Sequence, residues 1–205
     1  MKVFTYKNDL PDNFGTPESI AIDSETMGLN PFRDRLCVVQ LSTGDGVAHL
    51  VKFDNSKPLK APNLCKLLTN EKVLKIFHFG RFDITMIKQH LGVLCQPVYC
   101  TKIASKLIRT YTNKHSLREL CSLYANVDLS KQEQTSDWGA EALTKSQGSY
   151  AANDVLHLHN IKKELDLILK RENRQDLAQQ CFNFLPIVAE LDLLQWEVGD
   201  IFAHN

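Results

Sequence analysis

The sequence predicts an α/β fold, in which a mixed central sheet is flanked by helices, with a C-terminal helical extension. Short apolar runs separated by Gly- and Pro-containing turns fill the N-terminal part. Strand-like and helix-like segments then alternate, an order typical of α/β proteins. A helical pattern runs from Asn173 to the end of the chain. We therefore expect one main domain at residues 1–172 and a helical extension at residues 173–205, which packs on that domain or on a second protomer.

Four strands are expected early in the chain, at residues 3–6, 19–25, 36–42 and 47–51. The third is a nearly continuous apolar run, LCVVQLS, typical of a buried strand. Gly28 and Pro31 indicate the turn before it, and Gly44 and Gly46 the turn after it. Because these strands are close in sequence, we expect them to pair antiparallel as a meander.

Helices and strands alternate in the next part of the chain. Helices are predicted at residues 62–68, 82–90, 101–109 and 116–124, strands at 72–78 and 97–99, and a polar loop at 130–138. Gly92 is typical of a helix C-terminus, and Ser116 with Glu119 three residues later is typical of an N-terminal capping box. Pro186 lies inside the last helical pattern, of Leu177, Cys181, Phe184, Val188, Leu191, Val198 and Phe202, and is expected to kink it.

Composition excludes several functional classes. Lys plus Arg and Asp plus Glu are 24 each, so net charge argues against a large nucleic-acid footprint. No run approaches the ~20 apolar residues of a membrane span. Six scattered cysteines in apolar contexts indicate reduced thiols and a cytoplasmic protein. Between Asp83 and Glu119 there is no acidic residue, so this interval is either a solvated basic face or a track for phosphates.

Asp154 lies beside an apolar helical stripe in the second half of the chain. The stripe consists of Ala151, Val155, Leu158, Ile161, Leu165 and Ile168. Tyr150 and Asp154 are four residues apart, so they share one face of that helix, which begins near Thr144 or Ser146. A carboxylate in this position costs free energy unless it is paired or binds a metal.

Three further acidic residues complete a candidate metal site. Asp23 and Glu25 alternate along a strand, so both side chains point to one face. Asp83 follows the strand at 72–78, although alone it would also fit a helix N-terminus, and the Asp23 and Glu25 pair alone would fit a surface strand end. Carboxylates without a His- or Cys-rich set favour Mg²⁺ or Mn²⁺ over zinc.

Five ordered motifs carry a family resemblance. They are IDSETMGL at residues 22–29, FHFGRFD at 77–83, CTKIAS at 100–105, SDWG at 136–139 and YAAND at 150–154. Over residues 19–170 the chain resembles the DEDD superfamily of 3′–5′ exonucleases, in its tyrosine-bearing branch, and most closely ribonuclease D. The resemblance implies a ribonuclease H-like fold. Ser24, Met27 and Phe79 depart from the usual pattern, and we expect no helical domains of the HRDC kind after residue 172.

The resemblance also implies a mechanism and a metal content. Asp23, Glu25 and Asp154 would hold one divalent metal, and Asp23 with Asp83 a second, either Mg²⁺ or Mn²⁺. Tyr150 would orient the attacking hydroxide, because an unperturbed tyrosine titrates near ~10 and is a poor base. The implied activity is 3′–5′ hydrolysis of single-stranded RNA 3′ ends to 5′-mononucleotides.

Substrate contacts are expected from two groups of residues. Leu29 is the implied wedge against the terminal base, although a core leucine fits equally, and Phe82 is a candidate for base stacking. The remaining expected nucleic-acid contacts are His78, Lys102, Lys106, Arg109, Lys114, Arg118 and Trp138. A homodimer through the C-terminal helix is a further expectation. Two alternatives stay open, namely a DNA-directed exonuclease of the same chemistry and a nucleic-acid-binding module without catalysis.

Overall fold

The computed structural model describes residues 1–56, 58–129, 133 and 136–196, and its centre is a six-stranded sheet in the order β1-β4-β3-β2-β5-β6. The strands are β1 (Lys2–Lys7), β2 (Ser19–Thr26), β3 (Leu36–Ser42), β4 (Val47–Lys52), β5 (Leu74–Phe77) and β6 (Val98–Cys100). As predicted, the sheet is mixed. β2, β3 and β4 form the antiparallel meander, whereas β5 and β6 pair in parallel on the other side of β2.

The position of β1 differs from the expected meander. β1 pairs in parallel with β4, so it lies at the sheet edge rather than beside β2. The physical reason is the connection between β1 and β2, residues 8–18, which is long enough to cross the sheet. A tight hairpin turn is therefore not required, and the antiparallel rule for short turns does not apply to this strand.

Seven helices surround the sheet in the part of the chain that the structure describes. They are α1 (Pro62–Thr69), α2 (Arg81–Leu91), α3 (Thr101–Ile108), α4 (Leu117–Tyr124), α5 (Lys145–Leu156), α6 (Leu158–Arg171) and α7 (Gln175–Leu193). Gly92 ends α2 in the left-handed conformation, and Ser116 with Glu119 forms the predicted capping box of α4. Thr144 and Gln147 form a second capping box, at the start of α5. Most of the predicted loop at 130–138 lies outside the described residues.

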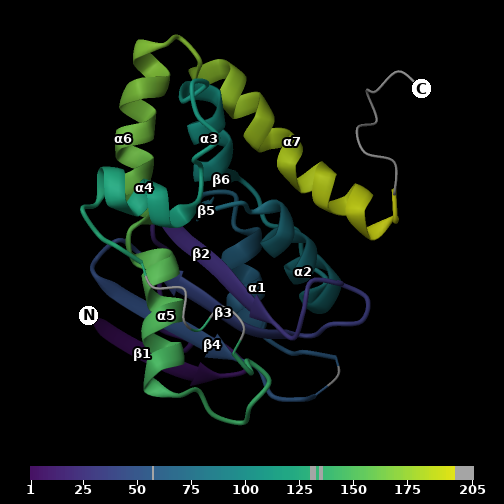
Figure 1. Ribbon diagram of the computed structural model, residues 1–205. Helices are drawn as coiled ribbons and strands as arrows, with labels where there is room; N and C mark the ends of the chain where they lie inside the picture. Colours follow the sequence, from purple (N-terminus) through teal and green to yellow (C-terminus); the bar gives the residue numbers. More distant parts are fainter. Residues whose placement is uncertain (57, 130–132, 134–135, 197–205) are drawn as a thin grey trace.

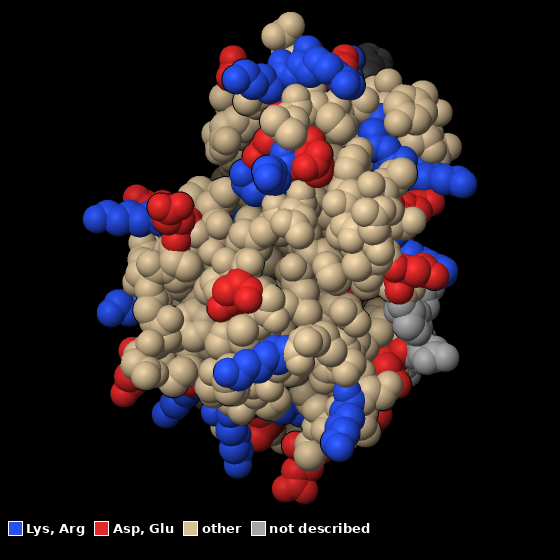
Figure 2. All heavy atoms as spheres, turned by 90° about the vertical axis from the view of Figure 1, so that its left-hand side faces the viewer, with Lys and Arg blue, Asp and Glu red and all other residues tan. Residues whose placement is uncertain are grey.

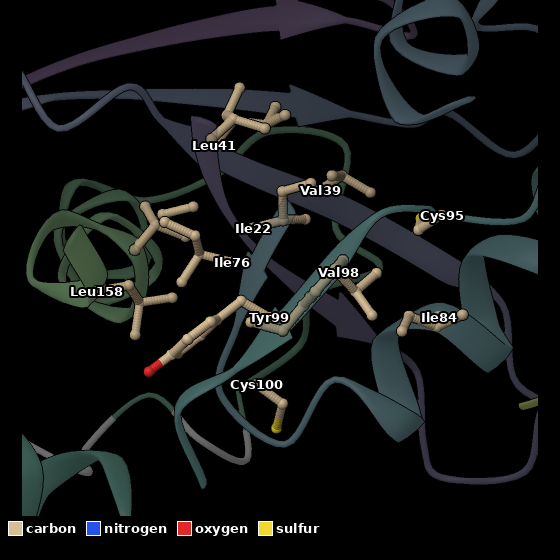
Figure 3. Close-up of a cluster of buried hydrophobic side chains, with 14 of the residues drawn as sticks. Ile22, Val39, Leu41, Ile76, Ile84, Cys95, Val98, Tyr99, Cys100 and Leu158 are labelled. Atoms are coloured by element: carbon tan, nitrogen blue, oxygen red, sulfur yellow. The ribbon is translucent and has the colours of Figure 1, made fainter. Parts of the chain in front are cut away.

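The helices form layers on the two faces of the sheet (Figure 1). α5 crosses one face and packs on β2, β3 and β4, whereas α1 and α2 lie on the other. The core between the layers includes Ile22, Val39, Leu41 and Ile76, from β2, β3 and β5 (Figure 3). Among the described residues, no helix has both the length and the apolar character needed to cross a bilayer.

The apolar stripe that carries Asp154 belongs to two helices. α5 ends at Leu156. The backbone N–H of its C-cap residue, His157, donates to the carbonyl of Val155, and α6 starts directly afterwards. The change of direction lets α5 follow the sheet while α6 packs on α3. Val155 and Leu158, on either side of the break, are both fully buried, so the periodicity of apolar residues continues across it and hides it in the sequence.

α7 packs on α2, α3 and β6 through a face that the sequence pattern did not single out. Its buried residues include Ala178, Phe182 and Leu185, whereas Leu177 and Phe184 of the predicted pattern are 54% and 37% exposed. α7 is apolar around much of its circumference, so two stripes with helical spacing compete in the sequence. The helix continues through Pro186, and the predicted positions Val198 and Phe202 lie outside the described residues.

Candidate active site

Three carboxylates from two distant parts of the chain converge on one point. Asp23 and Glu25 alternate along β2 and point to the face that α5 covers, and Asp154 comes from α5. One carboxylate oxygen from each residue lies within 4.8 Å of the others. This spacing fits a shared cation, since three carboxylates alone would repel one another.

Asp83 approaches the same site from α2. Its carboxylate is 3% exposed, and its Oδ1 accepts a 2.6 Å hydrogen bond from the Ser24 hydroxyl. Ser24 lies between the two acidic residues of β2, so this bond ties Asp83 to the strand that carries them. Asp83 lies outside the three-carboxylate group, but its charge raises the pKa of Asp23.

Burial raises the pKa of every carboxylate in the site, and repulsion by neighbouring carboxylates raises it further for Asp23, Glu25 and Asp154. The pKa of Glu25 rises to about 9, mainly through burial and then through the charge of Asp154. Burial raises the pKa of Asp83 to about 7 and, with the charge of Asp83, that of Asp154 to about 7. The pKa of Asp23 is also raised well above its usual value. A divalent cation would offset this cost, and an all-oxygen donor set fits Mg²⁺ or Mn²⁺.

Tyr150 lies one helical turn before Asp154 on α5, as predicted. Burial, and then the charges of Asp154 and Glu25, raise the pKa of its phenol, so the hydroxyl stays protonated near neutral pH. Trp138 packs beside it, with ring centroids 6.0 Å apart, and is only 2% exposed. The Trp138 ring therefore supports Tyr150 and offers little surface to a substrate.

Gln40 is a site residue that sequence patterns missed. It lies on β3 opposite Asp23 in the strand register and is fully buried. Its Nε2 donates a 2.9 Å hydrogen bond to Asp23 Oδ2, and among the described residues its Oε1 has no partner. An amide that orients a metal ligand and keeps an acceptor for water fits a metal site. The signal in the sequence is one polar residue inside the apolar run LCVVQLS.

A cavity of about 570 Å³ lies between the turn after β2 and the start of α2, and two predicted substrate contacts, Leu29 and Phe82, line it. Leu29 is 81% exposed, so it is not a core leucine. Phe82 is partly buried and packs against the core. His78 Nδ1 is 2.9 Å from the Thr101 hydroxyl, and burial together with Lys102 lowers the pKa of His78 to about 3. His78 is therefore neutral at physiological pH.

The predicted basic residues differ in how far their charged groups are available to phosphates. Lys102, Lys106 and Arg109 line a second cavity of about 630 Å³. Arg109 is 7% exposed and donates to the Lys114 carbonyl, and Arg118 pairs with Asp128 at 2.8 Å, so neither cation is fully available to phosphates. On the face of the molecule drawn in Figure 2, Lys and Arg are scattered among Asp and Glu rather than forming one basic patch.

Comparison with solved structures finds proteins that are similar to this one over the whole chain. The structure of Brucella melitensis NrnC is 52% identical, with a TM-score of 0.95 and full coverage of both chains. The same protein has been solved with bound Mg²⁺ and bound to pGG. Escherichia coli RNase D, at 24% identity and a TM-score of 0.74 over 84% of this chain, shares the fold.

Sequence comparison agrees with the structural likenesses. Ribonuclease D of Nitrobacter hamburgensis is 29% identical over 161 residues, which are 78% of this chain and 41% of that protein. The chain thus spans about two fifths of the length of such relatives. A family model described as 3′-5′ exonuclease matches residues 8–170, the part that contains all four carboxylates and Tyr150. The chain therefore belongs to the 3′–5′ exonuclease family and is related to ribonuclease D.

Proposed function

We propose that this protein is a metal-dependent 3′–5′ exoribonuclease that releases 5′-mononucleotides from single-stranded RNA 3′ ends. The convergence of Asp23, Glu25 and Asp154 within 4.8 Å, in a chain of the 3′–5′ exonuclease family, carries the proposal. The nearby Asp83 gives the fourth carboxylate of a two-metal arrangement. Intact carboxylates and tyrosine argue against a binding module without catalysis.

In this mechanism Asp23, Glu25 and Asp154 would hold one divalent ion, and Asp83 together with Asp23 would hold a second. When bound, such ions would lower the pKa of a coordinated water molecule and stabilise charge on the attacking and leaving oxygens. Tyr150, protonated because its pKa is raised, donates a hydrogen bond that orients the attacking water. The water oxygen would form a bond to phosphorus and lose a proton, the bond to the 3′ oxygen would break, and that oxygen would take up a proton, so the reaction has no net gain or loss of protons at these two oxygens. The products are a shortened RNA and a nucleoside 5′-monophosphate.

The length of the substrate is a second part of the proposal. NrnC, 52% identical over its full length, has been solved bound to pGG. We propose that this chain also accepts such very short RNA, since on the face drawn in Figure 2 Lys and Arg are scattered among Asp and Glu and form no long basic track. DNA of the same length is the competing substrate, because a carboxylate site does not itself read the 2′-hydroxyl.

A time course on matched 3′- and 5′-labelled RNA and DNA tests these statements. The substrates are pGG and longer single strands, each with Mg²⁺, with Mn²⁺ or with a chelator. The proposal predicts stepwise shortening of 5′-labelled RNA, immediate release of the 3′ label and no reaction with chelator. Binding without hydrolysis under every metal condition would support the non-catalytic module, and faster hydrolysis of DNA would support the DNA-directed enzyme.

We also propose a homodimer through α7. Leu177 and Ile187 on this helix are 54% and 44% exposed, an apolar surface that contact with a second copy would cover. Light scattering of the wild type should give the mass of a dimer. Ile187→Glu should give a monomer, whereas the control Ser122→Glu, at an exposed position on α4, should leave the dimer unchanged. A monomeric wild type at micromolar concentration would contradict this proposal.

A further inference from the structure

Two charged residues, Arg81 and Asp192, lie at helix ends that disfavour their charge. Arg81 is the first residue of α2, and Asp192 lies in the last turn of α7. The N-terminal end of a helix is positive and the C-terminal end is negative, so each side chain lies at the end that repels it. Neither charge stabilises its own helix, and the structure pairs the two residues with each other.

The ion pair between Arg81 and Asp192 is bidentate. Arg81 Nε donates to Asp192 Oδ2 at 2.7 Å, and Arg81 Nη2 donates to Asp192 Oδ1 at 2.5 Å. Two parallel bonds of this kind fix the orientation of both side chains. The Arg81 side chain is 52% exposed, so the pair contributes little to the stability of the whole fold. Its effect is therefore on the placement of the first turn of α2.

The first turn of α2 also carries one of the four site carboxylates. Asp83 lies two residues after Arg81, and it accepts the 2.6 Å hydrogen bond from Ser24 of β2. The N-cap residue of α2 is Gly80, which has no side chain to cap the turn. Two side chains from other elements hold the turn instead. Ser24 holds it from the sheet, and Asp192 holds it from α7.

We propose that Asp192 is a positioning residue for the second metal site, because through Arg81 it holds the turn that presents Asp83. This inference rests on the proposed function, since it requires a divalent ion between Asp23 and Asp83. Without the ion pair, only the hydrogen bond from Ser24 fixes the carboxylate of Asp83 on the metal-binding face. α7 lies outside residues 8–170, which the family model matches, so the C-terminal extension makes this contribution to the site.

A second ion pair between the same two helices provides a matched control. Lys88 Nζ lies 3.7 Å from Glu190 Oε1, and Lys88 is seven residues after Arg81 on α2. This pair therefore joins α7 to α2 without contact to the first turn of α2. Glu190 also lies in the last turn of α7, so Glu190→Gln and Asp192→Asn each remove one acidic group from the same helix end.

Calorimetric titration of Mn²⁺ tests the proposal, in the presence of a short RNA whose 3′-terminal linkage resists hydrolysis. Asp192→Asn should weaken the binding of one of two ions about tenfold, the lower end of the effect of removing a residue that orients a metal ligand. Binding of the other ion should stay unchanged, and Glu190→Gln should change neither. The exchanged double variant, Arg81→Asp with Asp192→Arg, should recover most of the lost affinity.

Thermal unfolding separates positioning from a general structural role. Each single variant loses one exposed ion pair, so Tm should fall by a similar small amount in both, whereas only Asp192→Asn should lose Mn²⁺ affinity. Equal affinity in Asp192→Asn and the wild type, equal losses in both variants, or a folded exchanged variant without recovery would overturn the inference. A wild type that binds no Mn²⁺ would instead contradict the proposed function, so the two failures are distinguishable.

Discussion

At the scale of single residues, the site depends on carboxylates that are held together against their own repulsion. Asp23 receives a hydrogen bond from Gln40 of β3, and Asp83 receives one from Ser24 of β2, so neutral side chains from two neighbouring strands hold these carboxylates. Spacing predicted that Asp23 and Glu25 share one face of a strand and that Tyr150 and Asp154 share one face of a helix, whereas the grouping of Asp23, Glu25 and Asp154 came from the combination of motifs and the family resemblance. Gln40 could not be predicted in the same way, because its role depends on the register between β2 and β3.

Substitution of Gln40 should weaken metal binding without unfolding the protein. Gln40→Met keeps the side-chain volume but removes the amide that orients Asp23, so we expect affinity for Mn²⁺ to fall by about 10- to 100-fold. Calorimetric titration measures this affinity, and Ser42→Ala, two residues along the same strand and also buried, is the matched control. Equal affinity in Gln40→Met and the wild type would show that the hydrogen bond to Asp23 has no role in ligand placement.

Tyr150→Phe should separate metal binding from turnover. In the proposed mechanism the phenol donates to the attacking water and is not a metal ligand, so metal affinity should stay unchanged. Removal of one such donor typically costs about 100-fold or more in kcat. Hydrolysis of 5′-labelled RNA at saturating metal measures the loss, and unchanged turnover would remove Tyr150 from the mechanism.

The raised pKa values predict how stability depends on pH and metal. Asp83 and Asp154 titrate at about 7 and Glu25 at about 9 in the folded protein, against ~4 when unfolded. The folded state therefore binds more protons, and without metal its stability falls as pH rises from about 4 to about 9. Mg²⁺ should remove this slope, so the rise in Tm on adding Mg²⁺ should grow with pH. A rise in Tm that is the same at every pH would contradict this prediction.

At the scale of helices and strands, the sequence patterns predicted where helices and strands form better than they predicted how these elements pair and pack. β1 was predicted as a strand, but its parallel pairing with β4 depends on the path of residues 8–18, which local residues do not specify. The boundary between α5 and α6 is hidden because the apolar period continues across His157. In α7, two apolar stripes with the same period made the buried face impossible to choose from spacing alone.

The buried face of α7 can be tested by truncating one residue on each side. Phe182 is 3% exposed and packs on Tyr99, with ring centroids 4.5 Å apart. Phe182→Ala should lower the free energy of unfolding by about 3–5 kcal/mol. Leu177→Ala, on the exposed face, should change it by less than about 0.5 kcal/mol in dilute, monomeric protein. Urea unfolding of both variants measures the difference, and similar losses would contradict the observed packing of α7.

At the scale of the whole molecule, the chain brings three separate segments together so that four acids share one site. The sheet presents Asp23 and Glu25, α5 covers that face with Asp154, and α2 adds Asp83 from the end of β5. The mixed sheet was predictable because strand-like and helix-like segments alternate after the predicted N-terminal meander. The placement of the surrounding cavities was not, since it depends on long-range contacts such as the one between Lys102 and Phe79.

The central claim is that divalent ions bind among these carboxylates, and anomalous diffraction from crystals grown with Mn²⁺ tests it most directly. We expect one strong anomalous peak coordinated by Asp23, Glu25 and Asp154, and a second one between Asp23 and Asp83 when an RNA 3′ end is bound. No anomalous peak at either position, with the carboxylate oxygens turned away from one another, would contradict the account.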